Sequence, residues 1–170
     1  MDYQINETIL YGVQICRIKS VEELSLSGEK KLYYVLQPVF HDSSIIYVPT
    51  NSRTLMSRMR RVLSAEEIRT LIHSISENEM EWIDNENKRK ESCRMILVSG
   101  DRRALVGLIR TFSQKKKEQE AARKKFRASD DRILKEAERI LYDEFAAVLN
   151  IRQEEVLPFI LAELHAAENQ

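Results

Sequence analysis

The chain has 170 residues, 43% of them hydrophobic, which is enough for a packed core in one domain or two small ones. It starts without a basic segment followed by an apolar run, and no run approaches the roughly 18 apolar residues of a membrane helix, so we expect neither secretion nor membrane insertion. The two distant cysteines, Cys16 and Cys93, favour reduced thiols and a cytoplasmic protein.

The formal net charge is zero, but the charges are unevenly distributed along the chain. Residues 102–127 carry ten bases and two acids, whereas residues 130–170 carry four bases and ten acids. The basic stretch is large enough to attract a polyanion. Two interpretations stay open, a solvated helix face or a surface that contacts nucleic acid.

The first 62 residues have the composition of β structure. Segments rich in β-branched and aromatic residues predict short strands, and turn-like residues at 26–30 and 40–44 separate the later ones. The predicted strands are residues 8–11, 13–21, 31–39 and 44–48, with 57–62 as a candidate fifth. This spacing leaves no room for crossover helices and predicts a small, strongly bent sheet or an SH3-like β-barrel over residues 1–62.

From Ser64 onward the periodicity becomes helical. Ser64 and Glu67 have the spacing of a capping box, and apolar residues then recur at helical intervals. Further helices are expected at about 84–97, from 101 with a possible extension to 125, from a start capped by Ser129, and at 153–167, where Pro158 kinks the helix or shifts its start. The sequence therefore predicts an α+β protein with a bundle of about five helices over residues 63–170.

Residue patterns typical of catalysis are missing from the sequence. None of the three histidines has a cysteine or carboxylate at a metal-ligand spacing, and the four glycines form no phosphate-binding loop. We therefore expect no enzyme, no cofactor, no metal and no small-molecule substrate. What remains is a binding function. An open strand edge with tyrosines such as Tyr34 and Tyr47 could pair with a strand of a partner protein, or these tyrosines could simply pack the interior of the barrel.

The order of motifs along the chain resembles the CarD family of bacterial regulators that bind RNA polymerase. The resemblance is carried by "INETILY", "KLYYVLQPV" and "IIYVPTNS" in the first half. In the second half it is carried by a tryptophan ahead of a basic cluster, by "SGD" before an apolar helix, and by "ASDDRILKEAERILYDEFAAVLNI". It covers nearly the whole chain.

This resemblance implies a Tudor-like polymerase-interacting domain at residues 1–62, shared with transcription-repair coupling factors. The domain would bind a lobe of the polymerase β subunit, partly by edge-strand pairing. The expected contacts are Tyr34, Tyr47, Val48 and Pro49. Tyr47 stands where some members of the family have a polymerase-contacting arginine.

The resemblance also implies that residues 63–170 contact promoter DNA at the upstream fork of the transcription bubble. Trp82 would be the wedge in the minor groove, and the protein, as a monomer, would stabilise the open complex with little sequence preference. The expected phosphate contacts are Lys88, Arg89, Lys90, Lys115, Lys116, Lys117, Lys124 and Lys125. The alternative is an adaptor of the same fold that binds polymerase or another protein, with Trp82 buried and no DNA contact.

Overall fold

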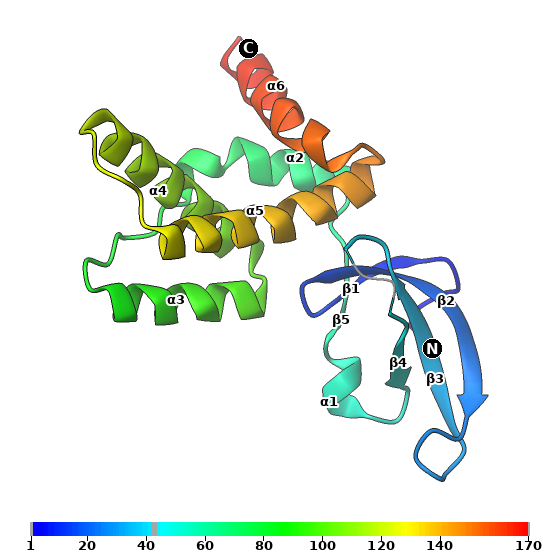
Figure 1. Cartoon of the computed structure of the whole chain (residues 1–170). Coiled ribbons are helices and arrows are strands. Elements are labelled where there is room, and N and C mark those ends of the chain that lie inside the picture. The colour runs from blue at the N-terminus through cyan, green and yellow to red at the C-terminus, as the bar shows by residue number, and fades with distance from the viewer. Residues whose placement is uncertain (1, 42–43, 170) are drawn as a thin grey trace. The chain divides into compact units, whose positions relative to one another are not determined.

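A computed structural model of the protein describes residues 2–41 and 44–169. The chain divides into two compact units, Met1–Val62 and Leu63–Gln170 (Figure 1). The first, here called the β unit, contains the sheet, and the second, the helical unit, contains the long helices, so the fold is α+β. No helix within the described ranges is long and apolar enough to cross a membrane.

The β unit is an antiparallel sheet of five strands in the order β4-β3-β2-β1-β5. The strands are β1 (Thr8–Tyr11), β2 (Gln14–Leu24), β3 (Lys31–Pro38), β4 (Ile46–Pro49) and β5 (Met59–Arg61). The predicted barrel is not confirmed, because the sheet is open: β4 and β5 form its two edges and do not pair with each other. Part of the predicted turn at 40–44 lies outside the described residues.

Alternation along the strands explains which face of the sheet is buried. Strand residues of alternate positions point to one face, and there they form a core with Tyr34 and Leu36 at its centre. A register shift between Ile18 and Ser20 marks a bulge in the long strand β2, and such bulges bend a strand. A single helical turn, α1 (Arg53–Met56), connects β4 to β5 and was not predicted.

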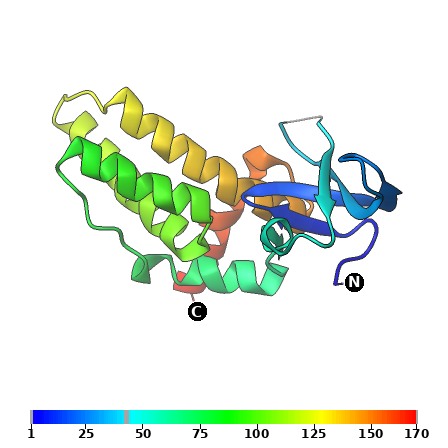
Figure 2. The same cartoon turned by 90° about the horizontal axis from the view of Figure 1, so that it is seen from below.

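The helical unit is organised around α5, which packs against each of the other four α-helices (Figures 1 and 2). These helices are α2 (Ala65–His73), α3 (Glu86–Ser99), α4 (Arg102–Ala121), α5 (Ala128–Leu149) and α6 (Val156–Glu168), with short 3-10 turns at Ile75–Glu77 and Gln153–Glu155. Their apolar stripes meet in a common core that includes Leu108, Phe112 and Phe145.

The helix ends test the local predictions directly. The capping box is confirmed: Ser64 Oγ accepts from the N–H of Glu67, and the Glu67 carboxylate accepts from the N–H of Ser64. The predicted cap at Ser129 is wrong, because the N-cap of α5 is Arg127, two residues earlier, and the Ser129 hydroxyl donates to Glu86 instead. Pro158 lies in the first turn of α6, where a missing N–H costs no helical hydrogen bond.

Candidate functional site

Trp82 lies in the loop before α3, and its ring packs on the core without being fully buried. The ring centroid is 5.1 Å from that of Phe112, which is completely buried in α4. The guanidinium of Arg89 lies 4.5 Å from the indole centroid and the ammonium of Lys115 lies 5.3 Å from it. Trp82 is therefore a half-buried ring held against the core and flanked by two cations.

Arg89 does not lie on the surface, which changes the expectation that it contacts phosphate. Its side chain is 3% exposed and makes two hydrogen bonds of 3.0 Å to the Asp130 carboxylate of α5. Its remaining terminal nitrogen donates to the carbonyls of Ile83 and Asp84, at 2.8 and 3.2 Å. In this arrangement Arg89 ties the Trp82 loop to α5, so we remove it from the candidate phosphate contacts.

The loop that carries Trp82 is also anchored on α4. The Thr111 hydroxyl accepts from the N–H of Met80 and donates to its carbonyl, at 3.1 and 2.8 Å. The loop backbone passes so close to Gly107 that a Cβ there would lie 3.4 Å from main-chain atoms of Glu79 and Met80. Gly107, Thr111 and Asp130 thus position Trp82, and the sequence analysis assigned none of them a role.

The predicted lysines fall into groups with different partners. Lys90 pairs with Glu86 at 3.0 Å and Lys116 pairs with Asp131 at 2.9 Å. The Lys116 contact raises the pKa of that ammonium, and hydrogen bonds from Lys135 and Lys116 lower the pKa of the Asp131 carboxyl. Of the predicted lysines, the exposed ones with no ion pair in the described ranges are Lys88, Lys117, Lys124 and Lys125.

The structure brings three of the predicted lysines together around the C-terminal end of α4. Lys116, Lys124 and Lys125 line a hollow of about 330 Å³ together with Phe126. The acids Glu120 and Asp131 share this hollow, so its charge is positive but not uniform. Lys88 and Lys90 are on a different helix, α3.

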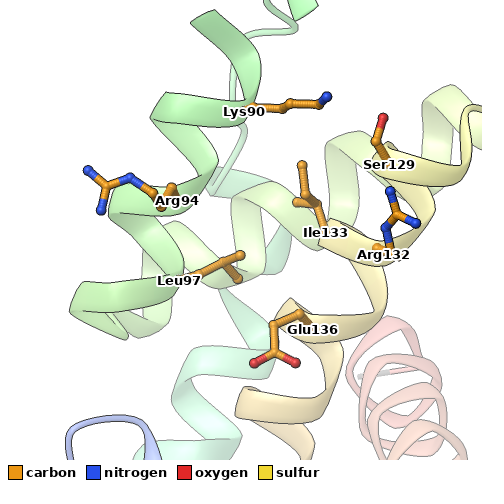
Figure 3. A pocket seen from close by; sticks show the side chains of 7 residues that line it. All are labelled: Lys90, Arg94, Leu97, Ser129, Arg132, Ile133 and Glu136. Atoms are coloured by element: carbon orange, nitrogen blue, oxygen red, sulfur yellow. The ribbon is translucent and has the colours of Figure 1, made fainter. Parts of the chain in front are cut away.

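Lys90 lies on the rim of a separate hollow of about 390 Å³ between α3 and α5 (Figure 3). Its apolar floor is formed by Leu97 and Ile133, and Arg94 and Arg132 add to its basic rim. In Figure 3 the guanidinium of Arg94 turns away from Ile133. The predicted lysines therefore do not form one continuous surface.

The outer edge of β4 is the exposed strand edge that the sequence led us to expect. The N–H of Thr50 donates to the carbonyl of Leu32 at 2.9 Å, and Tyr34 is opposite Val48. Because main-chain groups alternate in an antiparallel ladder, the N–H and C=O of Tyr47 point away from β3. Its side chain is 44% exposed. Pro49 is partly buried and contributes only a carbonyl to this edge.

Two of the four expected polymerase contacts have buried side chains. Tyr34 and Val48 are both 0% exposed and belong to the core of the β unit. The ring of Tyr34 packs edge-on against Tyr3 with centroids 6.0 Å apart, and its hydroxyl has no hydrogen-bond partner in the described structure. Their side chains are packing residues, which leaves Tyr47 and Pro49 as candidate contacts.

Within residues 2–41 and 44–169, no group of three or more His, Cys, Asp and Glu side chains is placed to hold a metal ion. Cys16 and Cys93 are both free and buried, and burial raises the pKa of each thiol to about 11. Thiols protonated at neutral pH are poor nucleophiles. The features suited to function are therefore a strand edge and a cation-flanked ring.

The β unit is a small sheet domain whose open edge can take part in binding. Residues 3–63 match the model of the family described as CarD-like/TRCF RID domain, and the β unit is therefore a CarD-like RNA polymerase-interacting domain. The match ends where the helical unit begins. A comparison with curated proteins found no match to the chain.

Proposed function

We propose that this protein is a CarD-like, non-enzymatic transcription regulator of the bacterial cytoplasm. Its β unit binds the β subunit of RNA polymerase, and its helical unit contacts promoter DNA at the upstream fork of the bubble. The family match of residues 3–63 supports the first contact. The half-buried Trp82, supported on Phe112 and flanked by Arg89 and Lys115, is the observation that supports the second.

The mechanism is a difference in affinity between two states of the DNA. An aromatic ring stacks well where base pairs are already separated, at about 1–3 kcal/mol per stacked base. Trp82 would bind the melted fork better than closed duplex, and only such a difference shifts an equilibrium. A bias of about 1.4 kcal/mol changes the ratio of open to closed complexes tenfold.

The contacts around Trp82 matter for this mechanism because the indole ring must keep its position when it inserts at the DNA fork. The buried Arg89–Asp130 pair and the Thr111 hydrogen bonds restrain the loop on two sides. The exposed lysines near the end of α4 would contact phosphates, which carry no sequence information. Promoter choice would then belong to the polymerase.

The substitution Trp82→Ala tests the wedge. We expect the variant to bind the β subunit as the wild type does, yet to lose most of the increase in open-complex lifetime, on the order of the tenfold effect above. The measurement is competitor-challenged decay of open complexes formed with purified polymerase. Phe159→Ala, at a half-buried aromatic of α6, is the matched control. An undiminished lifetime with Trp82→Ala would refute the wedge.

The substitution Tyr47→Pro tests the strand edge. Proline removes both the ring and the outward N–H at this position, whereas Tyr47→Ala removes the ring and keeps the N–H, so the difference between the two variants reports the N–H. If a polymerase strand pairs with β4, Tyr47→Pro should bind the β subunit more weakly than Tyr47→Ala by about 0.5–1.5 kcal/mol, or up to roughly tenfold. Binding is measured by calorimetry on the isolated lobe. Equal affinity of Tyr47→Pro and Tyr47→Ala would argue against edge pairing.

One observation favours a second candidate, a protein adaptor that makes no DNA contact. The Trp82 ring already packs on Phe112, as a structural tryptophan would. Acrylamide quenching separates the two functions: forked DNA should protect an indole that acts as a wedge. Emission that does not respond to forked DNA, together with intact polymerase binding, would favour the adaptor.

A further inference from the structure

The large apolar side chains that the helical unit leaves exposed lie on two of its helices. Among the described residues of this unit they are Met95 and Val98 of α3, and Leu157 and Leu161 of α6. The first pair is spaced three residues apart and the second pair four, so each pair lies on one helix face. Apolar side chains that cluster on a surface, unlike scattered ones, mark a place where another surface binds.

One side of α6 is fixed against the rest of the helical unit. The helix packs on α2 and α5, and its residues Val156 and Ile160 are buried. Glu163 pairs with Arg69 of α2 at 3.2 Å. Leu157, at 48% exposed, belongs to the other side of the helix.

The outward side of α6 is an apolar stripe that ends at an acid. Leu157, Leu161, Leu164 and Glu168 follow one another at intervals of four, three and four residues, which places them on one helix face. Glu168 is exposed and makes no ion pair with any described residue. Residues 151–169 carry one base and four acids, and the C-terminal end of a helix adds partial negative charge. These four residues, here called the α6 stripe, are therefore apolar in an acidic setting.

A second apolar surface, here called the α3 surface, has the opposite charge. It combines the exposed face of α3 with the hollow between α3 and α5 shown in Figure 3. Its apolar members are Met95, Leu97, Val98 and Ile133. The hollow is lined by three bases, Lys90, Arg94 and Arg132, and by one acid, Glu136.

The bases of the α3 surface can accept a new acidic partner. Lys90 pairs with Glu86, and Arg94 pairs with Glu91, but both members of each pair are at least about a third exposed. Exposed ion pairs contribute little to stability, so another carboxylate can replace the partner at little cost. The α3 surface is therefore complementary to the α6 stripe both in its apolar residues and in its charge.

The two surfaces do not meet within one copy of the chain. Figure 1 shows α3 and α6 on opposite sides of α5 within the helical unit. A surface that fits a different surface on another copy gives a head-to-tail contact, which can extend from copy to copy.

We propose that the α6 stripe of one copy binds the α3 surface of a second copy, so that the protein self-associates head to tail through its helical unit. This differs from the monomer expected from the sequence, and it does not depend on the proposed function. Leucines of the stripe exclude water at the centre of the contact, and Glu168 pairs with a base of the α3 surface. One helix face buries less than the roughly 1,200–2,000 Å² of a stable interface, so the contact is weak and forms at high protein concentration.

The test is sedimentation equilibrium of the full chain over a range of concentrations. The stripe variant, Leu157→Lys/Leu161→Lys, places lysines against the bases of the α3 surface. The α3 variant, Met95→Gln/Val98→Gln, removes apolar partners of the stripe without adding a charge that a lysine could pair with. All four side chains are exposed, so both variants should keep the fold, which circular dichroism checks.

The average mass of the wild type should rise with concentration beyond that of a dimer. Each variant alone should remain a monomer, because every copy lacks the same one of the two surfaces. An equimolar mixture of the two variants should form a one-to-one dimer and grow no further, since one intact stripe and one intact α3 surface remain. Leu26→Lys, at an exposed leucine of the β unit, is the matched control and should associate as the wild type does.

Three results would overturn the proposal. The first is a wild type that stays monomeric at every concentration, which would leave both surfaces to other proteins. The second is association of the α3 variant alone, which would mean that stripes pair with each other. The third is a mixture of the two variants that stays monomeric while the wild type associates.

Discussion

The two units of this protein bury polar groups in opposite ways. The core of the β unit is almost entirely apolar, and among the described residues the Tyr34 hydroxyl has no hydrogen-bond partner there. The helical unit buries four charged side chains, each of which is hydrogen-bonded. They are Arg89, Asp130, Asp143 and Glu144.

The difference reflects how each type of structure fixes its geometry. In a sheet, main-chain hydrogen bonds between strands set the register, so side chains need only pack. Each helix makes its main-chain hydrogen bonds within itself. The packing of apolar side chains alone therefore determines the arrangement of neighbouring helices less strictly. The buried Arg89–Asp130 pair adds a fixed contact between α3 and α5 here, and Arg89 also holds the loop that carries Trp82.

The largest expected effect comes from breaking a buried pair in the helical unit. Arg89→Met leaves Asp130 as a buried, unpaired charge and should lower the free energy of unfolding by about 3–5 kcal/mol. Arg94→Met, which breaks an exposed pair with Glu91, should leave the free energy of unfolding nearly unchanged, because solvent screens such pairs. Urea unfolding followed by circular dichroism measures both. A loss below about 1 kcal/mol for Arg89→Met would contradict the structural role of the pair.

The next effect concerns the exposed lysines of the helical unit. Replacing Lys117, Lys124 and Lys125 with Gln should weaken DNA association and reduce the slope of log affinity against log salt by about 2–3, since each phosphate contact contributes about 0.9. Filter binding to forked DNA over a salt series provides the measurement. Lys30→Gln, at an exposed lysine of the β unit, is the control. An unchanged slope for the triple variant would make these lysines a solvated face.

A smaller effect of opposite sign is expected in the β unit. Tyr34→Phe removes the unpartnered hydroxyl and should leave stability unchanged or raise it by up to about 1 kcal/mol. Tyr3→Phe removes a hydroxyl that donates to the carbonyl of Met59 at 3.0 Å, and should cost about 0.5–1.5 kcal/mol. Chemical unfolding of both variants measures the contrast. A clear loss with Tyr34→Phe would mean that its hydroxyl has a partner, such as a water molecule.

The smallest effect is shared by the two units, because each buries one thiol. Burial raises the pKa of Cys16 and of Cys93 to about 11 from the ordinary value of 9.0. The unfolded chain therefore releases these protons first, and stability should decline as the pH rises from about 9 to about 11. The measurement is the urea midpoint across this range. The variant Cys16→Ala/Cys93→Ala should show a shallower decline, and equal declines would contradict the prediction.

Features that depend on residues close together in sequence, such as strands and a capping box, were predictable. Features that depend on contacts between residues distant in sequence were not. The capping box of Ser64 and Glu67 depends on residues three apart and was predicted correctly. The Ser129 cap was predicted wrongly because the partner of that hydroxyl, Glu86, lies far away in sequence.

The same limit applies to the candidate site. Sequence placed Trp82 and Lys88 near each other but could not show that Arg89, between two exposed lysines, turns inward. Its partner Asp130 lies 41 residues further along the chain. Tyr34 and Tyr47 look equivalent in composition, and only the order of the strands separates a core ring from an edge ring.

The shortness of β4 has a consequence for solubility. An open strand edge invites pairing with any exposed strand, including that of another copy, and proteins limit this hazard with short edges and proline. β4 has four residues, and Pro49 at its end offers no N–H to extend a ladder. The edge therefore offers main-chain groups for a short pairing centred on Tyr47. The short strand and Pro49 disfavour the continuous edge-to-edge pairing of sheets that leads to aggregation.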